Sequence, residues 1–231
     1  MAELVEDGST IQLGIGAIAD AVAHAFLDKK DMGVHTEMIT NSILELVEAG
    51  AVNGRKKSIN RGIIVGAFSR GSQRLYDFMD HNPCVAMNPC SYVNNPHVIA
   101  RNYKMVSVNT AMGIDLLGQV SSESIGPMQY SGSGGQVDTV TGAIHATGGK
   151  SIIALASTAK NGTLSKICLS HAPGTAVTLS RNDVDYVATE YGIVRLSGRT
   201  VRERAKLLIS IAHPRLRDEL TAQAKSMGFL L

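Results

Sequence analysis

The sequence predicts an α/β fold with an open, mixed sheet flanked by helices. Short apolar runs typical of buried strands, such as GIIVGAF at 62–68, alternate along the chain with amphipathic segments of helical period. Glycine is plentiful at 23 residues and aromatic residues are scarce at 4%, which suits a fold in which backbone segments approach closely. No linker, internal repeat or low-complexity segment divides the 231 residues, so we expect one domain over 1–231 rather than two small ones.

The chain opens with a predicted strand, turn, helix and second strand. Thr10–Leu13 is the first strand, and the glycines of the following turn let the backbone come close to a ligand. Ala17–Leu27 is the helix, and Met32–Val34 is the second strand. The next expected elements are a helix at Met38–Ala49, a strand at Gly62–Phe68, a helix at Gly71–Met79, a strand at Cys84–Met87 and a short helix at Pro96–Arg101.

The rest of the chain continues the alternation around one glycine-rich segment. Strands are expected at Met105–Asn109 and Ile114–Gln119, followed by the glycine-rich loop Ser124–Asp138 and a helix at Val140–Thr147. Further strands are predicted at Ser151–Ala156, Ser165–Leu169, Val177–Ser180 and Tyr186–Thr189, and closing helices at Thr200–Ile211 and Pro214–Lys225. Proline is well suited to open the last helix.

Composition argues against several classes of function. A net charge of +2 is too small to indicate nucleic-acid binding, and we expect the basic run Arg55-Lys56-Lys57 to form a solvated turn. No apolar run approaches the roughly 18 residues that a membrane span needs, and the N-terminus does not resemble a signal peptide. The three cysteines form no C-x-x-C pair and the seven histidines no H-x-x-x-H, so no metal site or disulfide framework is predicted, and a reducing, cytoplasmic location fits.

Glu37 is the candidate catalytic residue. It follows the predicted strand Met32–Val34, and residues at the carboxyl ends of strands in α/β sheets commonly line ligand sites. The turn after the first strand would place backbone N–H donors at a helix N-terminus within reach of it. Most glutamates in a chain of this length are simply solvated, so spacing alone leaves both roles open. We expect the nearby His35 to pack or to form hydrogen bonds rather than to bind a metal.

The sequence disfavours two nucleotide-binding motifs. Gly14-Ile15-Gly16-Ala17-Ile18-Ala19 lacks the third glycine of a dinucleotide fingerprint, although Glu37 lies near the offset of its acidic residue. The segment SGSGGQ at 131–136 is not a P-loop, yet its glycines would free N–H groups to face an anion or a carbonyl oxygen. Ser131 and Ser133 lack the G-x-S-x-G spacing of a serine nucleophile.

A series of blocks in one order carries a family resemblance. The blocks are QLGIGAI at 12–18, HTEM at 35–38, LYDF at 75–78, NP at 95–96, DLLGQ at 115–119, YSGSGGQVD at 130–138 and TEYG at 189–192. In these the chain resembles, from about residue 5 to residue 222, the C-terminal half of the acetyl-CoA hydrolase/transferase family, and most closely its 4-hydroxybutyrate, butyrate and acetate CoA-transferases. Members are roughly twice this length, so we expect the N-terminal half to be missing here and Met1 not to be the native start.

The resemblance implies a CoA-transferase fold and a ping-pong transfer of coenzyme A. A glutamate at the position of Glu37 attacks the acyl-CoA carbonyl to give a mixed anhydride, and the CoA thiolate then forms a glutamyl-CoA thioester. A second carboxylate reverses these steps. Backbone N–H groups of Gly14, Ile15, Gly16, Ala17 and Ile18, and of Gly135, are the implied donors to the oxyanion and to the thioester end of CoA.

The resemblance also implies contacts to CoA and to the substrate carboxylate outside the glycine turn. Lys160 and the main chain of Met112 are the implied CoA contacts, with a surface lysine as the alternative for Lys160. Asn94 or Asn95 is expected to orient the substrate carboxylate. Glu190 in the TEYG block is considered as a second acid, but a structural role is favoured there.

Two positions depart from the family pattern. Ala19 stands in place of the usual proline, which would loosen the start of the helix, and Thr139 stands in place of an aromatic residue, which would alter the acyl pocket.

Three functions remain open at this point. The first is a CoA-transferase acting on an acyl-CoA and a short-chain carboxylate, with CoA thioester as substrate, no permanently bound cofactor and a homodimeric assembly. The second is a hydrolase, in which water takes the place of the incoming carboxylate. The third is a non-catalytic assembly domain that is inert without its N-terminal half.

Overall fold

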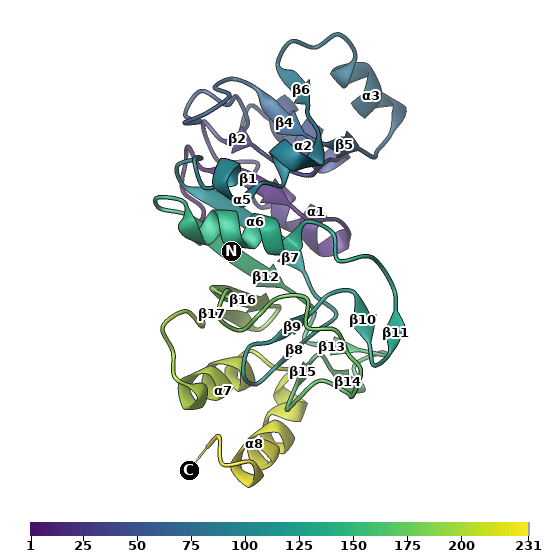
Figure 1. The fold of residues 1–231 in the computed structure, drawn as a ribbon, viewed down its shortest axis with the longest axis vertical. Coiled ribbons are helices and arrows are strands. Elements are labelled where there is room, and N and C mark those ends of the chain that lie inside the picture. The colour runs from purple at the N-terminus through teal and green to yellow at the C-terminus, as the bar shows by residue number, and fades with distance from the viewer. Residues whose placement is uncertain (231) are drawn as a thin grey trace. The chain divides into compact units, whose positions relative to one another are not determined.

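The structure is a computed structural model that describes residues 1–230 (Figure 1). The chain forms two compact units. The first consists of Met1–Asn109 and Asp138–Ser151, and the second of Thr110–Val137 and the chain from Ile152 onward. We describe each unit by itself.

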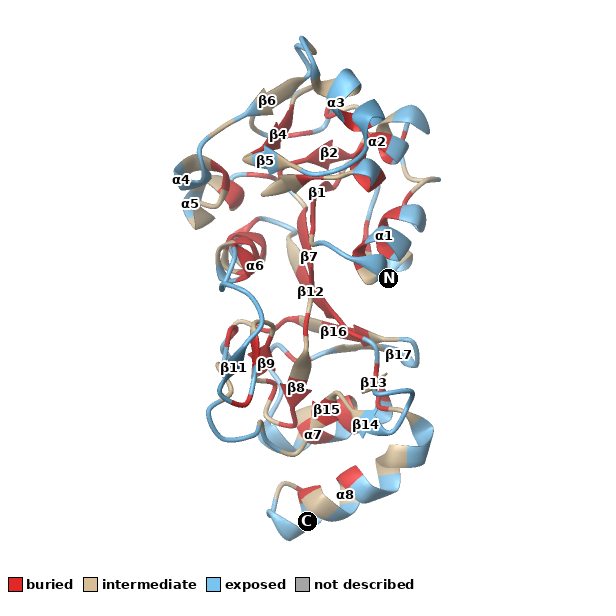
Figure 2. Ribbon diagram, turned by 90° about the vertical axis from the view of Figure 1, so that its right-hand side faces the viewer, coloured by how far each residue is buried: buried red, intermediate tan, exposed pale blue. Residues whose placement is uncertain are grey.

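Three parallel strands form the centre of the first unit. β1 (Thr10–Leu13) lies between β2 (Gly33–Val34) and β7 (Met105–Thr110), with Thr10 opposite both Gly33 and Met105. All four residues of β1 are buried, and β1 and β7 are largely red in Figure 2. Because the three strands run in one direction, their carboxyl ends, and the loops that follow them, meet at one edge.

Helices cover both faces of these strands. α1 (Ala17–His24) and α2 (Asn41–Glu48) pack together, and α6 (Gln136–His145) lies on the opposite side of β1 and β7 from α1 (Figure 2). Ile99, Met105, Ala143 and Ala146 form a buried cluster under α6. The remaining elements of the unit are η1 (Ala2–Leu4), β3 (Met38–Ile39), β4 (Ile64–Gly66), β5 (Phe68–Ser69), α3 (Gln73–Met79), β6 (Val85–Met87), α4 (Cys90–Val93) and α5 (Pro96–Ile99).

Three predictions for this unit need correction. The predicted helix Met38–Ala49 begins only at Asn41, because Met38–Ile39 pairs in parallel with Phe68–Ser69. That pairing also splits the predicted strand Gly62–Phe68 into β4 and β5. The helix predicted to reach Leu27 ends at His24, and the short helix α4 was not predicted.

The second unit contains both parallel and antiparallel pairs. β16 (Tyr186–Thr189) pairs in parallel with β12 (Lys150–Ala154) and antiparallel with β17 (Gly192–Arg195). β8 (Gly113–Asp115) likewise pairs in parallel with β15 (Ile167–Cys168) and antiparallel with β9 (Val120–Ser121). Two small hairpins complete the strands: β10 (Ser124–Ile125) with β11 (Met128–Gln129), and β13 (Thr158–Ala159) with β14 (Leu164–Ser165). The predicted mixed sheet flanked by helices is confirmed.

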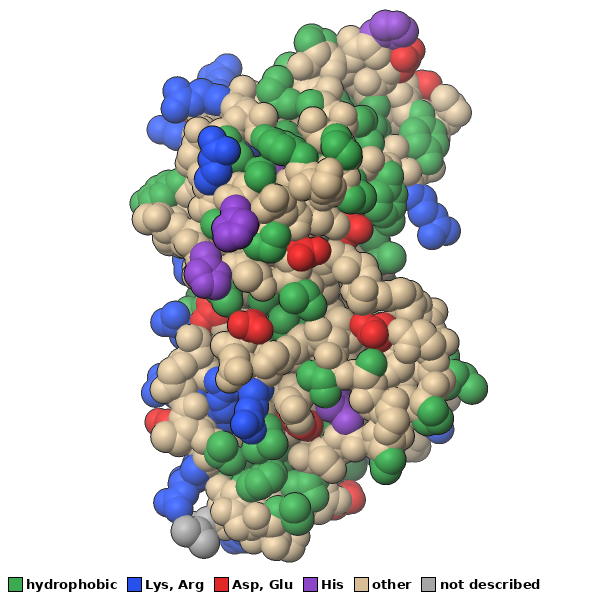
Figure 3. Space-filling model, viewed as in Figure 1, with side chains coloured by type: hydrophobic (Ala, Val, Ile, Leu, Met, Phe, Trp, Pro, Cys, Tyr) green, Lys and Arg blue, Asp and Glu red, His purple; other side chains and the backbone are tan. Residues whose placement is uncertain are grey.

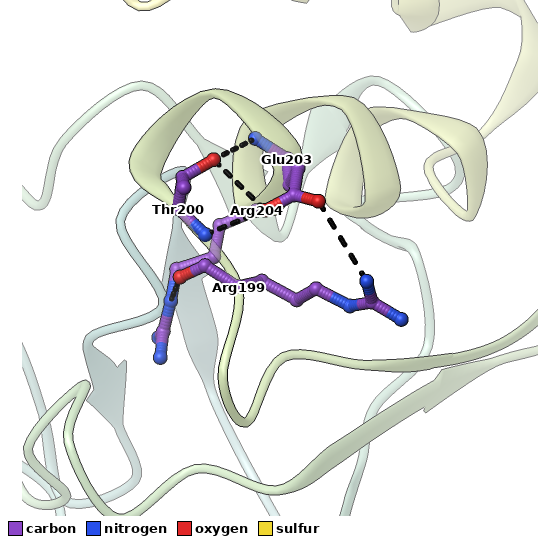
Figure 4. A network of polar contacts seen from close by, with 4 residues as sticks. All are labelled: Arg199, Thr200, Glu203 and Arg204. Atoms are coloured by element: carbon purple, nitrogen blue, oxygen red, sulfur yellow. Dashed lines mark hydrogen bonds and ion pairs between the residues drawn. The ribbon is translucent and has the colours of Figure 1, made fainter.

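The C-terminal helices begin where the sequence predicts. α7 (Val201–Ser210) has a capping box, in which the Thr200 Oγ1 accepts a hydrogen bond from the Glu203 N–H and the Glu203 carboxylate accepts one from the Thr200 N–H (Figure 4). Pro214 opens a 3₁₀ turn, η2 (Pro214–Leu216), which leads directly into α8 (Arg217–Ser226).

Several predicted segments of the second unit differ from the structure. The predicted strand Ile114–Gln119 ends at Asp115, because the Asp115 carboxylate accepts hydrogen bonds from the N–H groups of Leu117 (3.0 Å) and Gln119 (2.8 Å) and closes a turn. The predicted strand Val177–Ser180 is reduced to a single bridge between Leu179 and Val120. The loop predicted over Ser124–Asp138 contains the hairpin β10–β11, and α6 begins within it at Gln136.

Charged side chains are dispersed. On the face drawn in Figure 3, lysine and arginine side chains stand in separate groups among polar and apolar ones. Within residues 1–230, no helix has the length and apolar character that crossing a membrane requires.

Lys57 departs from the prediction of a solvated basic turn. Its side chain is only 1% exposed, and Nζ donates hydrogen bonds to the carbonyl oxygens of Val34 (2.8 Å) and Ile63 (2.7 Å). Its stem lies against Gly33, where an added Cβ would come within 2.2 Å of the Lys57 Cγ. Burial lowers the pKa of Lys57 from its ordinary 10.5 to about 7. A neutral amine has two N–H donors, which matches the two carbonyl acceptors.

We expect this lysine to make stability rise with pH above neutrality. The folded-state pKa lies below the unfolded-state pKa, so between about pH 7 and pH 10.5 the unfolded chain binds more protons and the free energy of unfolding increases with pH. The slope is at most about 1.4 kcal/mol per pH unit. Urea unfolding of the wild-type chain and of Lys57→Met between pH 7 and 10 measures the difference. Parallel pH profiles for the two proteins would contradict the prediction.

Candidate active site

Glu37 lies just beyond β2, on a backbone that is fixed from two sides. The N–H of Thr36 donates to the carbonyl of Val65 (3.0 Å), and the Glu37 carbonyl accepts from the N–H groups of Ala67 (2.9 Å) and Phe68 (3.2 Å). The Glu37 side chain is half-buried. The backbone is therefore held in place while part of the side chain stays accessible.

The glycine turn follows β1, the neighbouring strand. The Thr36 Oγ1 donates to the carbonyl of Leu13 (3.4 Å), which links the residue before Glu37 to the residue before the turn. The Gly14 N–H donates to the Val108 carbonyl at 2.7 Å, so it belongs to the sheet and cannot serve as the predicted oxyanion donor. Gly16 is the N-cap of α1 at φ 98°, and no side chain caps this helix. The first N–H groups of a helix have no partner within it, which leaves those of Ala17 and Ile18 for a ligand.

A buried polar network lies beneath the turn. The Asn109 Nδ2 donates to the Ser107 Oγ (2.9 Å) and the Thr139 Oγ1 (3.1 Å), and the Ser107 Oγ donates to the Gln12 Oε1 (2.7 Å). A Cβ added at Gly14 would lie 3.5 Å from the Asn109 Cα and 3.3 Å from the Val108 carbonyl oxygen. A side chain at position 14 would therefore be a tight fit, because the backbone of β7 passes directly behind the turn.

His35 ties a second segment to β2. Its ring is 1% exposed, and Nε2 donates to the Val93 carbonyl at 2.9 Å. Burial, together with the charge of Lys57, lowers the pKa of His35 to about 4 even though the hydrogen bond to Val93 opposes this. His35 is therefore neutral at physiological pH, and it is the hydrogen-bonding residue that the sequence indicated.

The side chains of Asn94 and Asn95 have different surroundings. The Asn95 side chain caps α5 by accepting a hydrogen bond from the His97 N–H at 2.9 Å. Asn94 follows Val93, which His35 holds against β2, and its Oδ1 is buried with no hydrogen-bond partner within residues 1–230. The Asn95 Oδ1 is therefore engaged in a helix cap and the Asn94 Oδ1 is not; because a carboxamide oxygen only accepts, an anionic ligand would be met by the Nδ2 donors.

A cleft opens where α1 and α2 begin. Its volume is about 640 Å³, and Gly16 of the turn and Met38, the neighbour of Glu37, both line it. Arg70 and Asn41 contribute polar groups to the wall, and two acidic side chains, Asp20 and Glu45, reach it as well. The cleft therefore reaches the glycine turn and the residue after Glu37, but Glu37 does not line it.

The remaining predicted contacts belong to the second unit. Met112 lies before β8, and its N–H donates to the Ser121 carbonyl at 2.9 Å, so only its carbonyl oxygen remains for a main-chain contact. Gly135 is buried just before α6. Lys160 is exposed at the tip of the β13–β14 hairpin with φ 49°, where its own carbonyl accepts a hydrogen bond from the Thr163 Oγ1 (2.8 Å).

The surroundings of Glu190 and Cys168 suit a structural role rather than a catalytic one. The Glu190 carboxylate accepts hydrogen bonds from the N–H (2.8 Å) and the Oγ (2.6 Å) of Ser157, and although burial opposes ionisation, these bonds hold the pKa of Glu190 below its ordinary value. Burial, aided by the charge of Asp115, raises the pKa of the Cys168 thiol to about 12, so it is not a nucleophile. Over the described residues, no group of three histidine, cysteine or acidic side chains could hold a metal ion.

Comparison with known proteins identifies the family. The acetyl-CoA hydrolase/transferase C-terminal domain matches residues 71–224, which is more than half of the chain. The chain belongs to the acetyl-CoA hydrolase/transferase family.

Named relatives of this family cover nearly all of the chain. It is 51% identical over 228 residues to a succinyl-CoA:cyclohexane-1-carboxylate CoA transferase of Geobacter metallireducens, covering 99% of this chain and 52% of the relative. It is 52% identical over 224 residues to a 4-hydroxybutyrate coenzyme A transferase of Clostridium kluyveri, covering 97% and 52%. The crystal structure of RipA from Yersinia pestis superposes with a TM-score of 0.94 at 42% identity, covering 99% and 52%. The chain therefore spans about half the length of the curated relatives it matches.

Sequence analysis did not single out the polar network of Gln12, Ser107, Asn109 and Thr139. A signal for part of it was present, because Ser107 and Asn109 alternate with apolar residues in MVSVN and so share one face of the strand. Thr139, which departs from the family pattern, is 3% exposed, and its hydroxyl accepts a hydrogen bond from Asn109. An aromatic residue other than tyrosine could not accept that bond.

We expect the free energy of unfolding to fall in acid, because His35 stays neutral in the folded protein while the same histidine becomes protonated in the unfolded chain. The folded-state pKa of about 4 lies below the ordinary 6.5, so between these values the unfolded chain binds more protons and stability falls as pH falls. The loss is at most of order 3 kcal/mol. His35→Gln keeps an N–H donor for Val93 but does not titrate, so the wild-type chain should lose stability relative to this variant between pH 6.5 and 4 in urea unfolding. An unchanged difference across that range would refute the prediction.

Proposed function

We propose that this chain is the catalytic C-terminal part of a CoA-transferase and that Glu37 is its nucleophile. The observation that carries the proposal is the placement of Glu37: it is half-buried just beyond β2, and its neighbour Thr36 donates a hydrogen bond to the carbonyl of Leu13, the residue before the glycine turn that leads into the uncapped helix α1. The substrate class is an acyl-CoA and a short-chain carboxylate such as acetate, butyrate or 4-hydroxybutyrate. The names of the relatives, among them the 4-hydroxybutyrate coenzyme A transferase, support this class.

The reaction proceeds by two exchanges at one carboxylate. The Glu37 oxygen attacks the thioester carbonyl carbon, the C–S bond breaks, and an acyl-glutamyl anhydride and CoA thiolate result. The thiolate then attacks the glutamyl carbonyl carbon, releasing the acyl group as a carboxylate and leaving a glutamyl-CoA thioester. An incoming carboxylate repeats the two steps in reverse and restores Glu37.

Backbone donors supply the electrostatic part of catalysis. The N–H groups at the start of α1, from Ile15 to Ile18, stand at the positive end of the helix dipole, where a developing oxyanion is stabilised. Gly14 contributes by letting the turn pass close to Asn109, not by donating. Removing one oxyanion donor typically costs about 10²–10³ in rate.

Asn94 is the residue that we assign to the substrate carboxylate or to the glutamyl oxyanion. Its carboxamide is held close to β2 through the hydrogen bond from His35 to Val93. Asn95 is assigned to capping α5. Met112, Gly135 and Lys160 are kept as the CoA contacts that the family resemblance implies, with Met112 acting through its carbonyl oxygen.

A cytoplasmic homodimer that includes an N-terminal half completes the proposal. All three cysteines are free, which fits a reducing compartment. The chain covers about half the length of its relatives, which is the basis for including a second half.

Replacing Glu37 should abolish formation of the covalent intermediate. In Glu37→Gln the nucleophilic carboxylate is lost while side-chain volume is kept, so acyl-CoA exchange should fall by at least 10³-fold, within the range for loss of a covalent nucleophile. Glu48→Gln, an exposed glutamate of α2 that pairs with Arg74, is the matched control. Borohydride or hydroxylamine treatment after addition of acyl-CoA, followed by peptide mass mapping, identifies the carboxylate that carries the label. A label on any other acid would overturn the assignment.

The two asparagines should behave differently when shortened. Asn94→Ala removes the available carboxamide and should lower the transfer rate by roughly 10-fold or more, as loss of an oxyanion donor does. Asn95→Ala removes a helix cap and should cost about 1 kcal/mol of stability with little effect on rate. Steady-state kinetics and thermal unfolding of both variants separate the two effects. A larger rate loss for Asn95→Ala would reverse our assignment.

The alternative functions are tested by the same assays. Loss of acetyl-CoA that does not require added acetate indicates the hydrolase. Activity that appears only when the chain is joined to an N-terminal half indicates that the isolated part is inert on its own.

A further inference from the structure

Asp138 is a second carboxylate at the edge of the sheet where Glu37 lies. It occupies the first turn of α6, is half-buried, and belongs to the same compact unit as Glu37. Within residues 1–230, no lysine, arginine or histidine forms an ion pair with it. The transfer reaction described above gives this carboxylate no role.

A chain of hydrogen bonds connects the neighbours of the two acids. Thr36, before Glu37, donates to the Leu13 carbonyl, and Gly14 donates to the Val108 carbonyl of β7. Asn109, the next residue of β7, donates to Thr139, which follows Asp138. The three strands are parallel and in register, so this path runs along their carboxyl ends and brings the start of α6 to the glycine turn.

The charge of Glu37 acts on Asp138. Burial first, and then repulsion from Glu37, raise the pKa of Asp138. Glu37 loses its charge when it becomes a thioester, so that repulsion disappears in the covalent intermediate. Asp138 is then the ionised carboxylate that remains, and its position in the first turn of α6 favours that form.

Resting on the proposed function, we propose that Asp138 is the general base of the hydrolytic branch of the reaction. A water oxygen attacks the carbonyl carbon of the glutamyl-CoA thioester while a water proton passes to an Asp138 oxygen. The C–S bond breaks, CoA leaves as the thiolate and takes the proton from Asp138, and the restored Glu37 carboxyl group ionises. Transfer to a carboxylate needs no such base, because the incoming nucleophile is already an anion.

The test compares hydrolysis with transfer in one preparation. The chain joined to its N-terminal half is loaded with acetyl-CoA, free nucleotide is removed, and release of CoA from the glutamyl-CoA form is followed without and with acetate. In Asp138→Asn, release without acetate should fall at least 10-fold, at the lower end of what general bases contribute, while transfer to acetate changes less than about 3-fold. Asp77→Asn, an exposed acid on α3, should change neither rate.

A second variant and a pH profile distinguish a base from a structural residue. Asp138→Glu restores a carboxylate and should recover most of the hydrolysis, and the acidic limb of the wild-type hydrolysis profile should be absent in Asp138→Asn. His35, with a pKa of about 4, does not supply a limb above pH 5. A parallel fall of both rates in Asp138→Asn, or unchanged hydrolysis, would overturn the inference. If glutamyl-CoA does not form in the wild-type protein, the proposed function itself is wrong.

Discussion

The parallel pairing of β1 with both β2 and β7 is the constraint on which the candidate site depends. One strand direction brings three carboxyl ends together: the turn at Gly14 follows β1, Glu37 follows β2, and the buried Asn109 lies in the last residues of β7. None of these residues is adjacent in the sequence. A shift of the pairing by one residue would turn every side chain of β1 to the other face, so the register and the site are specified together.

The chemistry of the site follows from what the sheet leaves unpaired. Within residues 1–230, hydrogen bonds use the backbone around Glu37, the N–H of Gly14 and the Oδ1 of Asn95, and leave the start of α1 without a side-chain cap and the Asn94 Oδ1 without a partner. A carboxylate is a modest nucleophile, so an acid-based transfer relies on preorganised donors around it. In the reaction that we propose, binding along the long CoA tail can be used to reach the transition state, so one covalent residue is sufficient.

Much of this could be predicted from the sequence, and the failures share a cause. The strands at 10–13 and 105–109, the glycine turn, the position of Glu37 after β2 and the family were all available from local pattern and motif order. Local sequence pattern could not reveal which distant strands pair, or which polar side chains are buried or bind the backbone. Met38–Ile39 has a helical period but pairs with Phe68–Ser69, the strand after Ile114 is stopped by the Asp115 carboxylate, and Lys57 looks solvated in sequence yet is buried. The choice between Asn94 and Asn95 likewise required coordinates.

The contact between Gly33 and Lys57 links two positions that lie far apart in the sequence. The lysine stem occupies the volume that any side chain at position 33 would need, and the glycine is buried within β2. Among homologues, position 33 should therefore accept alanine or a larger residue only where position 57 has become small. A library that randomises either position alone should yield few folded variants. A library that randomises both positions should also yield variants in which an apolar residue at position 33 fills the space of the Lys57 side chain and no lysine is buried.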